Sequence, residues 1–126
     1  MEFGLHVSPI CLPPQGYILG SHLNLTITGW GKLGYQGGEG EIPKQTKLGG
    51  VVHLREASVP VIARANCSSE AVYGSGNRLS AGMFCAGDLN GGGPDACQGD
   101  SGGPAVAEIQ GKKTLIGKTG NNVWKN

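Results

Sequence analysis

The chain of 126 residues is long enough for one domain with a modest hydrophobic core. Its formal net charge is +1, which argues against binding to nucleic acid or to an anionic membrane surface. No apolar run approaches the length of a transmembrane span, and the opening Met-Glu-Phe-Gly-Leu-His is too short and acidic for a signal peptide.

Short strands joined by tight loops are predicted along the whole chain. Glycine accounts for 24 of the 126 residues, and apolar runs alternate with turn residues without an internal repeat. This pattern predicts an all-β domain. Residues 32–50 predict a long surface loop after the first strand. In chain order, strands are expected near 25–30, 50–57, 82–86, 104–109 and 113–117, with a short helix near 63–71.

Residues 93–104 carry the strongest functional signal and read Gly-Pro-Asp-Ala-Cys-Gln-Gly-Asp-Ser-Gly-Gly-Pro. The glycines beside Ser101 allow a substrate to approach the hydroxyl closely and permit positive φ angles. A serine becomes a nucleophile when a base accepts its proton, and N–H groups around such a turn can stabilise an oxyanion. The alternative is an ordinary surface turn, which a bare Gly-x-Ser-Gly would favour.

These twelve positions resemble, in register, the active-site loop of trypsin-like serine endopeptidases. The resemblance covers roughly residues 2–117. It implies an all-β fold, namely an incomplete second (C-terminal) antiparallel β-barrel of the two-barrel fold. Residues 1–24 would be the inter-barrel linker, 25–117 the partial barrel, and 118–126 a tail outside the family pattern. Further segments follow in the family's order, namely Ile-Cys-Leu-Pro-Pro at 10–14, Ile-Thr-Gly-Trp-Gly at 27–31, Leu-Arg-Glu-Ala-Ser-Val-Pro-Val-Ile at 54–62 with Cys67, and Gly-Met-Phe-Cys-Ala-Gly at 82–87.

The resemblance implies a role for each residue of the loop. Ser101 is the expected nucleophile, and the N–H groups of Gly99 and Ser101 form the oxyanion hole. Asp95 falls at the floor of the specificity pocket, where a carboxylate favours Arg or Lys before the scissile bond. Asp100 is expected to pair with the α-amino group that zymogen cleavage releases. Protein and peptide substrates are therefore implied, with no cofactor and no metal.

The catalytic base of the family has no counterpart in this sequence. None of His6, His22 and His53 lies in the Thr-Ala-Ala-His-Cys-like context that the family uses, and the orienting aspartate is also missing. Because the hydroxyl needs that base, we expect the 126-residue chain alone to be inactive. The first hypothesis is a partial chain of a secreted endopeptidase that cleaves after Arg or Lys when intact. The alternative is a non-catalytic, protease-like module that binds or regulates partners, which a complete transcript starting at Met1 would favour.

Four cysteines suggest an oxidising compartment. By resemblance, Cys67 pairs with Cys85, whereas Cys97 lacks its downstream partner and Cys11 would tether a propeptide or light chain. The last two are therefore expected to be unpaired. A further bridge of the family would need cysteines at positions 25 and 107, but Leu25 and Ala107 stand there, which predicts apolar packing in place of the bridge.

Location, modification and stability follow from the same reading. The family is secreted, so an extracellular location is implied although the chain has no export signal of its own. Asn24-Leu-Thr26 and Asn66-Cys-Ser68 match the acceptor pattern for N-glycosylation. Five strands of a six-stranded barrel cannot close, so we expect exposed strand edges and a marginal domain.

Overall fold

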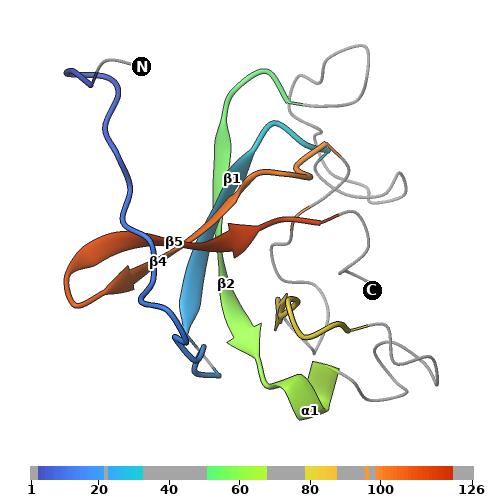
Figure 1. Cartoon of the computed structure of the whole chain (residues 1–126). Coiled ribbons are helices and arrows are strands. Elements are labelled where there is room, and N and C mark those ends of the chain that lie inside the picture. The colour runs from blue at the N-terminus through green and yellow to red at the C-terminus, as the bar shows by residue number, and fades with distance from the viewer. Residues whose placement is uncertain are drawn as a thin grey trace.

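An antiparallel sheet is the framework of the computed structural model (Figure 1). The structure describes residues 3–21, 23–32, 51–67, 79–87, 96 and 99–120. Within these ranges, five strands lie in the order β3-β2-β1-β4-β5, and every neighbouring pair is antiparallel. The all-β prediction is confirmed. The elements are β1 Asn24–Gly29, β2 Arg55–Ile62, α1 Arg64–Cys67, β3 Cys85–Ala86, β4 Pro104–Ile109 and β5 Lys112–Lys118.

Strand β2 lies further along the chain than the sequence predicted, because it runs from Arg55 to Ile62 rather than over 50–57. Proline has no N–H to donate and is therefore rare inside a sheet, yet Pro60 lies within this strand. Val61 N–H donates to Leu23 C=O at 2.8 Å. Hydrogen-bonded positions alternate along an antiparallel pair, so the Pro60 nitrogen faces away from β1. The strand can therefore continue through the proline.

The strand expected near 82–86 is shorter in the structure, and the helix expected near 63–71 lies only partly within the described residues. The strand expected near 82–86 consists of Cys85–Ala86, and the helix expected near 63–71 is described only as α1, Arg64–Cys67. The predicted loop at 32–50 lies outside the described residues apart from its first position. No helix among the described residues is long and apolar enough to cross a membrane.

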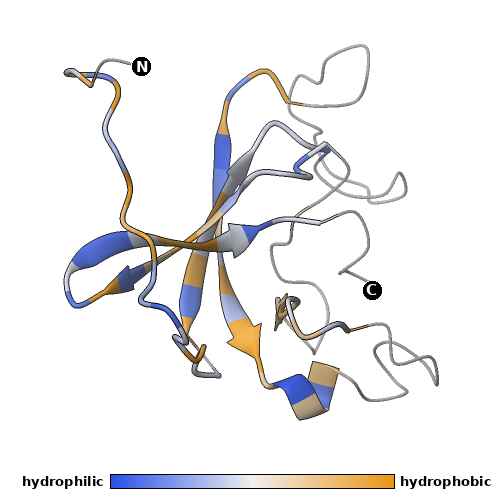
Figure 2. Ribbon diagram, in the orientation of Figure 1, coloured by the Kyte–Doolittle hydropathy of each residue, from blue (hydrophilic) through white to orange (hydrophobic). Residues whose placement is uncertain are grey.

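The hydrophobic core lies on one face of the sheet. Hydrophobic and hydrophilic residues therefore alternate along the strands in Figure 2. In β1 the side chains of Leu25 and Ile27 are buried, whereas Asn24, the first residue of the strand, is exposed. Side chains alternate between the two faces of a strand, so the sequence pattern assigns the buried face directly. The buried cluster comprises Leu25, Ile27, Val59, Val61, Ala86, Ala105 and Ala107.

Apolar packing occupies the place of the bridge that the family would have at 25 and 107. Strand β1 pairs with β4 through Thr26 opposite Val106 and Ile27 opposite Ala105, and this register brings Leu25 opposite Ala107. Leu25 is 1% exposed and Ala107 is 2% exposed, and both belong to the same cluster. The large and the small side chain therefore fill the space together, as the sequence predicted.

The sheet curls, so that segments next to its two outer strands touch. Phe84 directly precedes β3, and its ring lies so close to Gly117 of β5 that a Cβ there would be 2.8 Å from Cε1. A bulge in the pairing of β4 with β5, between Ala105 and Val106, supports this curvature. Glycine at 117 is therefore needed for the close approach of the ring.

The N-terminal segment covers part of the outer edge of β5. Cys11 N–H donates to Lys113 C=O at 3.3 Å, and Leu115 N–H donates to Cys11 C=O at 2.8 Å, which makes a parallel bridge. Figure 1 shows this segment crossing beside β5. The edge of β5 is thus less exposed than the sequence predicted. Unpaired backbone groups at an edge invite association with other chains, and this contact satisfies two of them.

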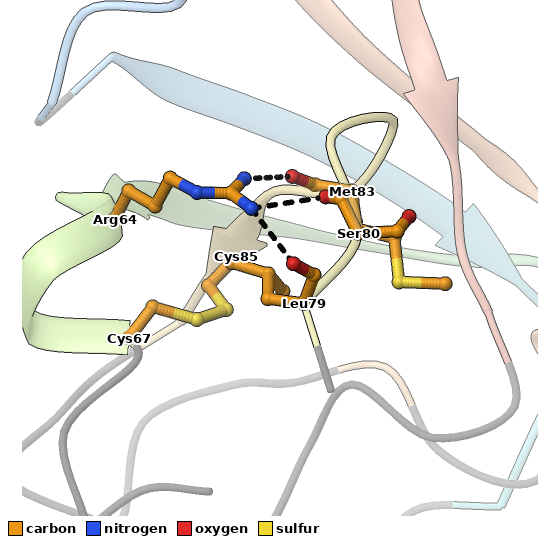
Figure 3. The surroundings of a disulfide bond; sticks show 6 residues. All are labelled: Arg64, Cys67, Leu79, Ser80, Met83 and Cys85. Carbon is orange, nitrogen blue, oxygen red and sulfur yellow. Dashed lines mark hydrogen bonds between the residues drawn. A yellow bond between two sulfur atoms is a disulfide. The ribbon is translucent and has the colours of Figure 1, made fainter. Parts of the chain in front are cut away.

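A disulfide joins α1 to β3 and confirms the predicted pairing of Cys67 with Cys85 (Figure 3). Both residues are almost completely buried. The bond closes a separation of 18 residues, for which loop entropy gives a stabilisation of about 3 kcal/mol. This bond holds the short outer strand beside β2.

Arg64 reinforces the same junction from the first residue of α1. Its guanidinium donates to the carbonyl groups of Leu79 at 2.7 Å, Ser80 at 3.1 Å and Met83 at 3.2 Å (Figure 3). The planar guanidinium presents several N–H groups in a fixed geometry, so one side chain can bind several carbonyls of a turn. The turn that leads into β3 is therefore fixed by a covalent bond and by a charged side chain.

We expect Leu25→Ala to lower the free energy of unfolding by about 2–5 kcal/mol, because it removes buried atoms and leaves a cavity opposite Ala107. Leu5→Ala is the matched control, since Leu5 is 99% exposed and its change should stay within about 0.5 kcal/mol. Urea unfolding followed by tryptophan fluorescence measures both. Equal shifts in the two variants would contradict the proposed core.

Candidate active site

Ser101 lies exposed on a turn between two glycines with positive φ angles, directly before β4. Gly99 has φ +104° and Gly102 has φ +86°, a region that residues with a Cβ rarely adopt. A Cβ at Gly99 would also lie 3.0 Å from the Cα of Gly31. The glycines of the motif are therefore required by the shape of the turn that presents the hydroxyl.

The Asp100 carboxylate is seated against the backbone that follows β1. Gly31 N–H donates to Asp100 Oδ1 at 2.7 Å. A Cβ added at Gly29 or at Gly31 would overlap the carboxylate, so only glycine leaves room for it at both positions. The Gly-Trp-Gly segment and the Gly-Asp-Ser-Gly segment, which are about 70 residues apart in the sequence, thus fit together.

Thr119 holds the other side of the turn. Its N–H donates to Gly103 C=O at 2.9 Å, and its C=O accepts from Gly102 N–H at 2.8 Å. Its hydroxyl donates to Asp100 C=O and lies 3.4 Å from Gly103 C=O. Because Thr119 is only 7% exposed, these bonds form away from water. One residue at the end of β5 therefore fixes the turn through its backbone and its side chain.

The backbone amides of the turn divide into two groups. Gly102 N–H and Gly103 N–H are bound, the second to Asp100 C=O at 2.9 Å. The N–H groups of Gly99 and Ser101 have no acceptor among the described residues. These are the two amides that the sequence resemblance assigns to an oxyanion hole.

The structure brings no base to the Ser101 hydroxyl among the residues it describes. His6 and His53 are exposed, and neither forms a hydrogen bond with Ser101. His22 lies outside the described residues. Among the described residues there is also no cluster of three or more His, Cys, Asp or Glu side chains that could hold a metal.

Two further predicted residues, Asp95 and Cys97, lie outside the described residues, so the pocket floor stays a prediction. Cys11 is exposed and is the free cysteine of the described part of the chain. Asn24 and Asn66 are both exposed, at the start of β1 and within α1.

Sequence reasoning missed Thr119 and Arg64 as residues that position the turn and the junction with β3. Thr119 follows β5 in the segment to which the sequence assigned no role, and no local pattern distinguishes its hydroxyl from that of another threonine. Arg64 was missed because it binds backbone carbonyls of Leu79, Ser80 and Met83, which come from a separate turn. Only the folded chain brings these groups together.

Comparison with known families places the chain in one family. The sequence model of the family described as Trypsin matches residues 1–122, which is nearly the whole chain. The chain belongs to the trypsin family. The described sheet and the turn that presents Ser101 are therefore those of a trypsin-family member.

Over the aligned residues, relatives in this family are about two fifths identical to the chain. Serine proteinase stubble of Drosophila melanogaster is 39% identical over 110 residues, which are 87% of this chain and 12% of that protein. Hepatocyte growth factor activator serine protease of Homo sapiens is 41% identical over 113 residues, 88% of this chain and 15% of that protein. Trypsin Blo t 3 of Blomia tropicalis is 41% identical over 99 residues, 78% of this chain and 33% of that protein. The chain thus spans a third or less of the length of these trypsin-family relatives.

We expect Gly31→Ala to destabilise the fold by about 1–3 kcal/mol, because the added Cβ displaces the Asp100 carboxylate from its seat. Gly82→Ala is the control: a Cβ there meets no atom within 4 Å, so its effect should stay within about 0.5 kcal/mol. Urea midpoints of the two variants provide the comparison. If Gly31→Ala behaves like Gly82→Ala, the close fit of the carboxylate is wrong.

Thr119→Val removes the hydroxyl and keeps the shape and both backbone bonds of the residue. We expect a loss of about 1 kcal/mol and about five-fold faster native-state hydrogen exchange at the Gly102 amide. Thr119→Ser, which keeps the hydroxyl, should exchange close to the parent rate. Exchange at Gly102 that is the same in the Val variant and the parent would show that the hydroxyl does not hold the turn.

Proposed function

We propose that the chain supplies the nucleophile half of the catalytic domain of a secreted, trypsin-like serine endopeptidase. The observation that supports this most directly is the turn from Gly99 to Gly103. It presents an exposed Ser101 while Asp100 and Thr119 fix the residues around it. A turn held from both sides fits a nucleophile that must keep one position relative to its substrate.

In the proposed reaction, Ser101 Oγ attacks the carbonyl carbon of a peptide bond as an imidazole accepts its proton. The N–H groups of Gly99 and Ser101, which have no acceptor among the described residues, would bind the resulting oxyanion. The imidazole and its orienting carboxylate would come from the first barrel of the domain. The tetrahedral intermediate would then collapse: its C–N bond breaks, and the imidazolium gives its proton to the leaving amine. Water would hydrolyse the resulting acyl-enzyme, with the same imidazole as base.

The proposed substrates are proteins with Arg or Lys before the scissile bond. Asp95 precedes Ser101 by six residues, the spacing at which the family places the pocket floor. A carboxylate there would pair with the cationic side chain in a site of low dielectric constant.

Activation is proposed to act on Asp100. In the described structure its carboxylate accepts from Gly31 N–H. A new α-amino group, released when a zymogen is cleaved, would add a charged partner and order the turn around Ser101. The exposed Cys11 would link the domain to a propeptide or light chain.

The 126-residue polypeptide alone should show no labelling by a fluorophosphonate probe above the rate of its Ser101→Ala variant. The reason is that no imidazole among the described residues hydrogen-bonds to the hydroxyl, and loss of triad members lowers the rate by several orders of magnitude. Labelling is read by gel fluorescence and by the mass of the modified peptide. Labelling of the parent chain that disappears in Ser101→Ala would contradict the proposal that the first barrel must supply the base.

A fusion to the first barrel of a relative tests the positive side of the proposal. With that barrel supplying histidine and aspartate, labelling and hydrolysis of an arginyl ester should both appear and should depend on Ser101. Asp95→Asn in the same fusion should abolish the preference for arginyl over phenylalanyl esters. A folded fusion without any Ser101-dependent activity would favour a non-catalytic binding module.

A further inference from the structure

The first three residues of β1 form an acceptor sequence for N-linked sugar, Asn24-Leu25-Thr26. Asn24 is exposed, Leu25 is 1% exposed and Thr26 is half-buried. Because side chains alternate along a strand, Asn24 and Thr26 share the outer face of the sheet while Leu25 enters the core. Both polar side chains of the acceptor sequence therefore lie on the side away from the core.

Exposed polar side chains of β2 lie beside the acceptor sequence and suit a hydrated oligosaccharide. On β2, Pro60 lies opposite Asn24 and Ser58 lies opposite Thr26, followed by Glu56 opposite Thr28. Ser58 and Glu56 are exposed. Because Asn24 is itself exposed, a sugar attached to its side chain can extend from this face into solvent.

The acceptor lies at the end of β1 that is remote from the nucleophile turn. Asp100 contacts Gly29 and Gly31 at the far end of the strand. A rise of about 3.3 Å per residue places Asn24 about 16 Å from Gly29. Figure 1 shows the start of β1 and the turn before β4 at opposite ends of the sheet. A sugar on Asn24 is therefore compatible with an accessible Ser101.

We propose that Asn24 is a site of N-linked glycosylation, an inference that rests on the secretion included in the proposed function. In the transfer, Asn24 Nδ2 forms a bond to C1 of the first sugar of a lipid-linked pyrophosphate oligosaccharide. The C1–O bond to the pyrophosphate breaks, and the lipid pyrophosphate leaves with the electron pair. The amide nitrogen loses one proton, so no oxidant or reductant is needed.

The second acceptor sequence, which begins at Asn66, has a different setting. Its middle residue, Cys67, is completely buried and bonded to Cys85. Arg64, two residues before the acceptor, fixes α1 to the neighbouring turn. Asn66 thus lies between a residue held by hydrogen bonds and a residue held by a disulfide, whereas Asn24 lies exposed at the start of β1. The structural argument therefore supports Asn24 alone.

The experiment expresses the full 126-residue chain behind a cleavable export signal in eukaryotic cells. Protein is collected from the medium and from the cells, because both fractions pass the compartment where transfer occurs. Treatment with peptide N-glycosidase and peptide mass spectrometry then reveal Asn24 converted to Asp. The variants are Asn24→Gln, Thr26→Val, which removes the hydroxyl of the acceptor sequence, and Thr26→Ser, which keeps it.

We expect a glycan on Asn24 in the parent and in Thr26→Ser, and complete loss of that glycan in Asn24→Gln and Thr26→Val. An Asn66→Gln variant should retain it. Unmodified Asn24 in both fractions of the parent would overturn the inference. Protein that carries the Asn24 glycan but never reaches the medium would instead count against the secretion in the proposed function.

Discussion

The Asp100 carboxylate occupies a space that two glycines leave open beside the end of β1, and the presentation of Ser101 depends on this fit. The residue before the nucleophile is thereby anchored to a strand that begins more than 70 residues earlier in the chain. Side chains at Gly29 and Gly31 would close the space. The glycines of both motifs consequently serve one contact, in which the backbone of one segment binds the side chain of the other.

The sheet provides the rigid support that this contact needs. Strand β1 lies in the centre, between β2 and β4, and its buried residues pack against small alanines of β4. On the far side, the disulfide between Cys67 and Cys85 and the guanidinium of Arg64 hold the junction of α1 with β3. The exposed turn with Ser101 is thus carried by elements whose own positions are fixed by burial and by covalent closure.

Much of this arrangement could be predicted from local signals. The position of β1 was predicted, and Leu25 with Ala107 indicated apolar packing where the family has a bridge. The continuation of β2 to Ile62 could not be predicted, because a proline weakens a strand unless its nitrogen faces away from the partner, and that orientation depends on register. The role of Thr119 was equally hidden, since its partners are backbone groups brought near by the fold.

The attachment of the turn to Thr119 has a mechanical consequence for the reactive hydroxyl. Thr119 directly follows β5, which is an outer strand whose free side is occupied in part by the segment containing Cys11. The turn that carries Ser101 is therefore held by a residue next to an edge strand of the sheet. A molecule that pairs with this edge, or that displaces Cys11 from it, would therefore contact the strand that leads directly into Thr119.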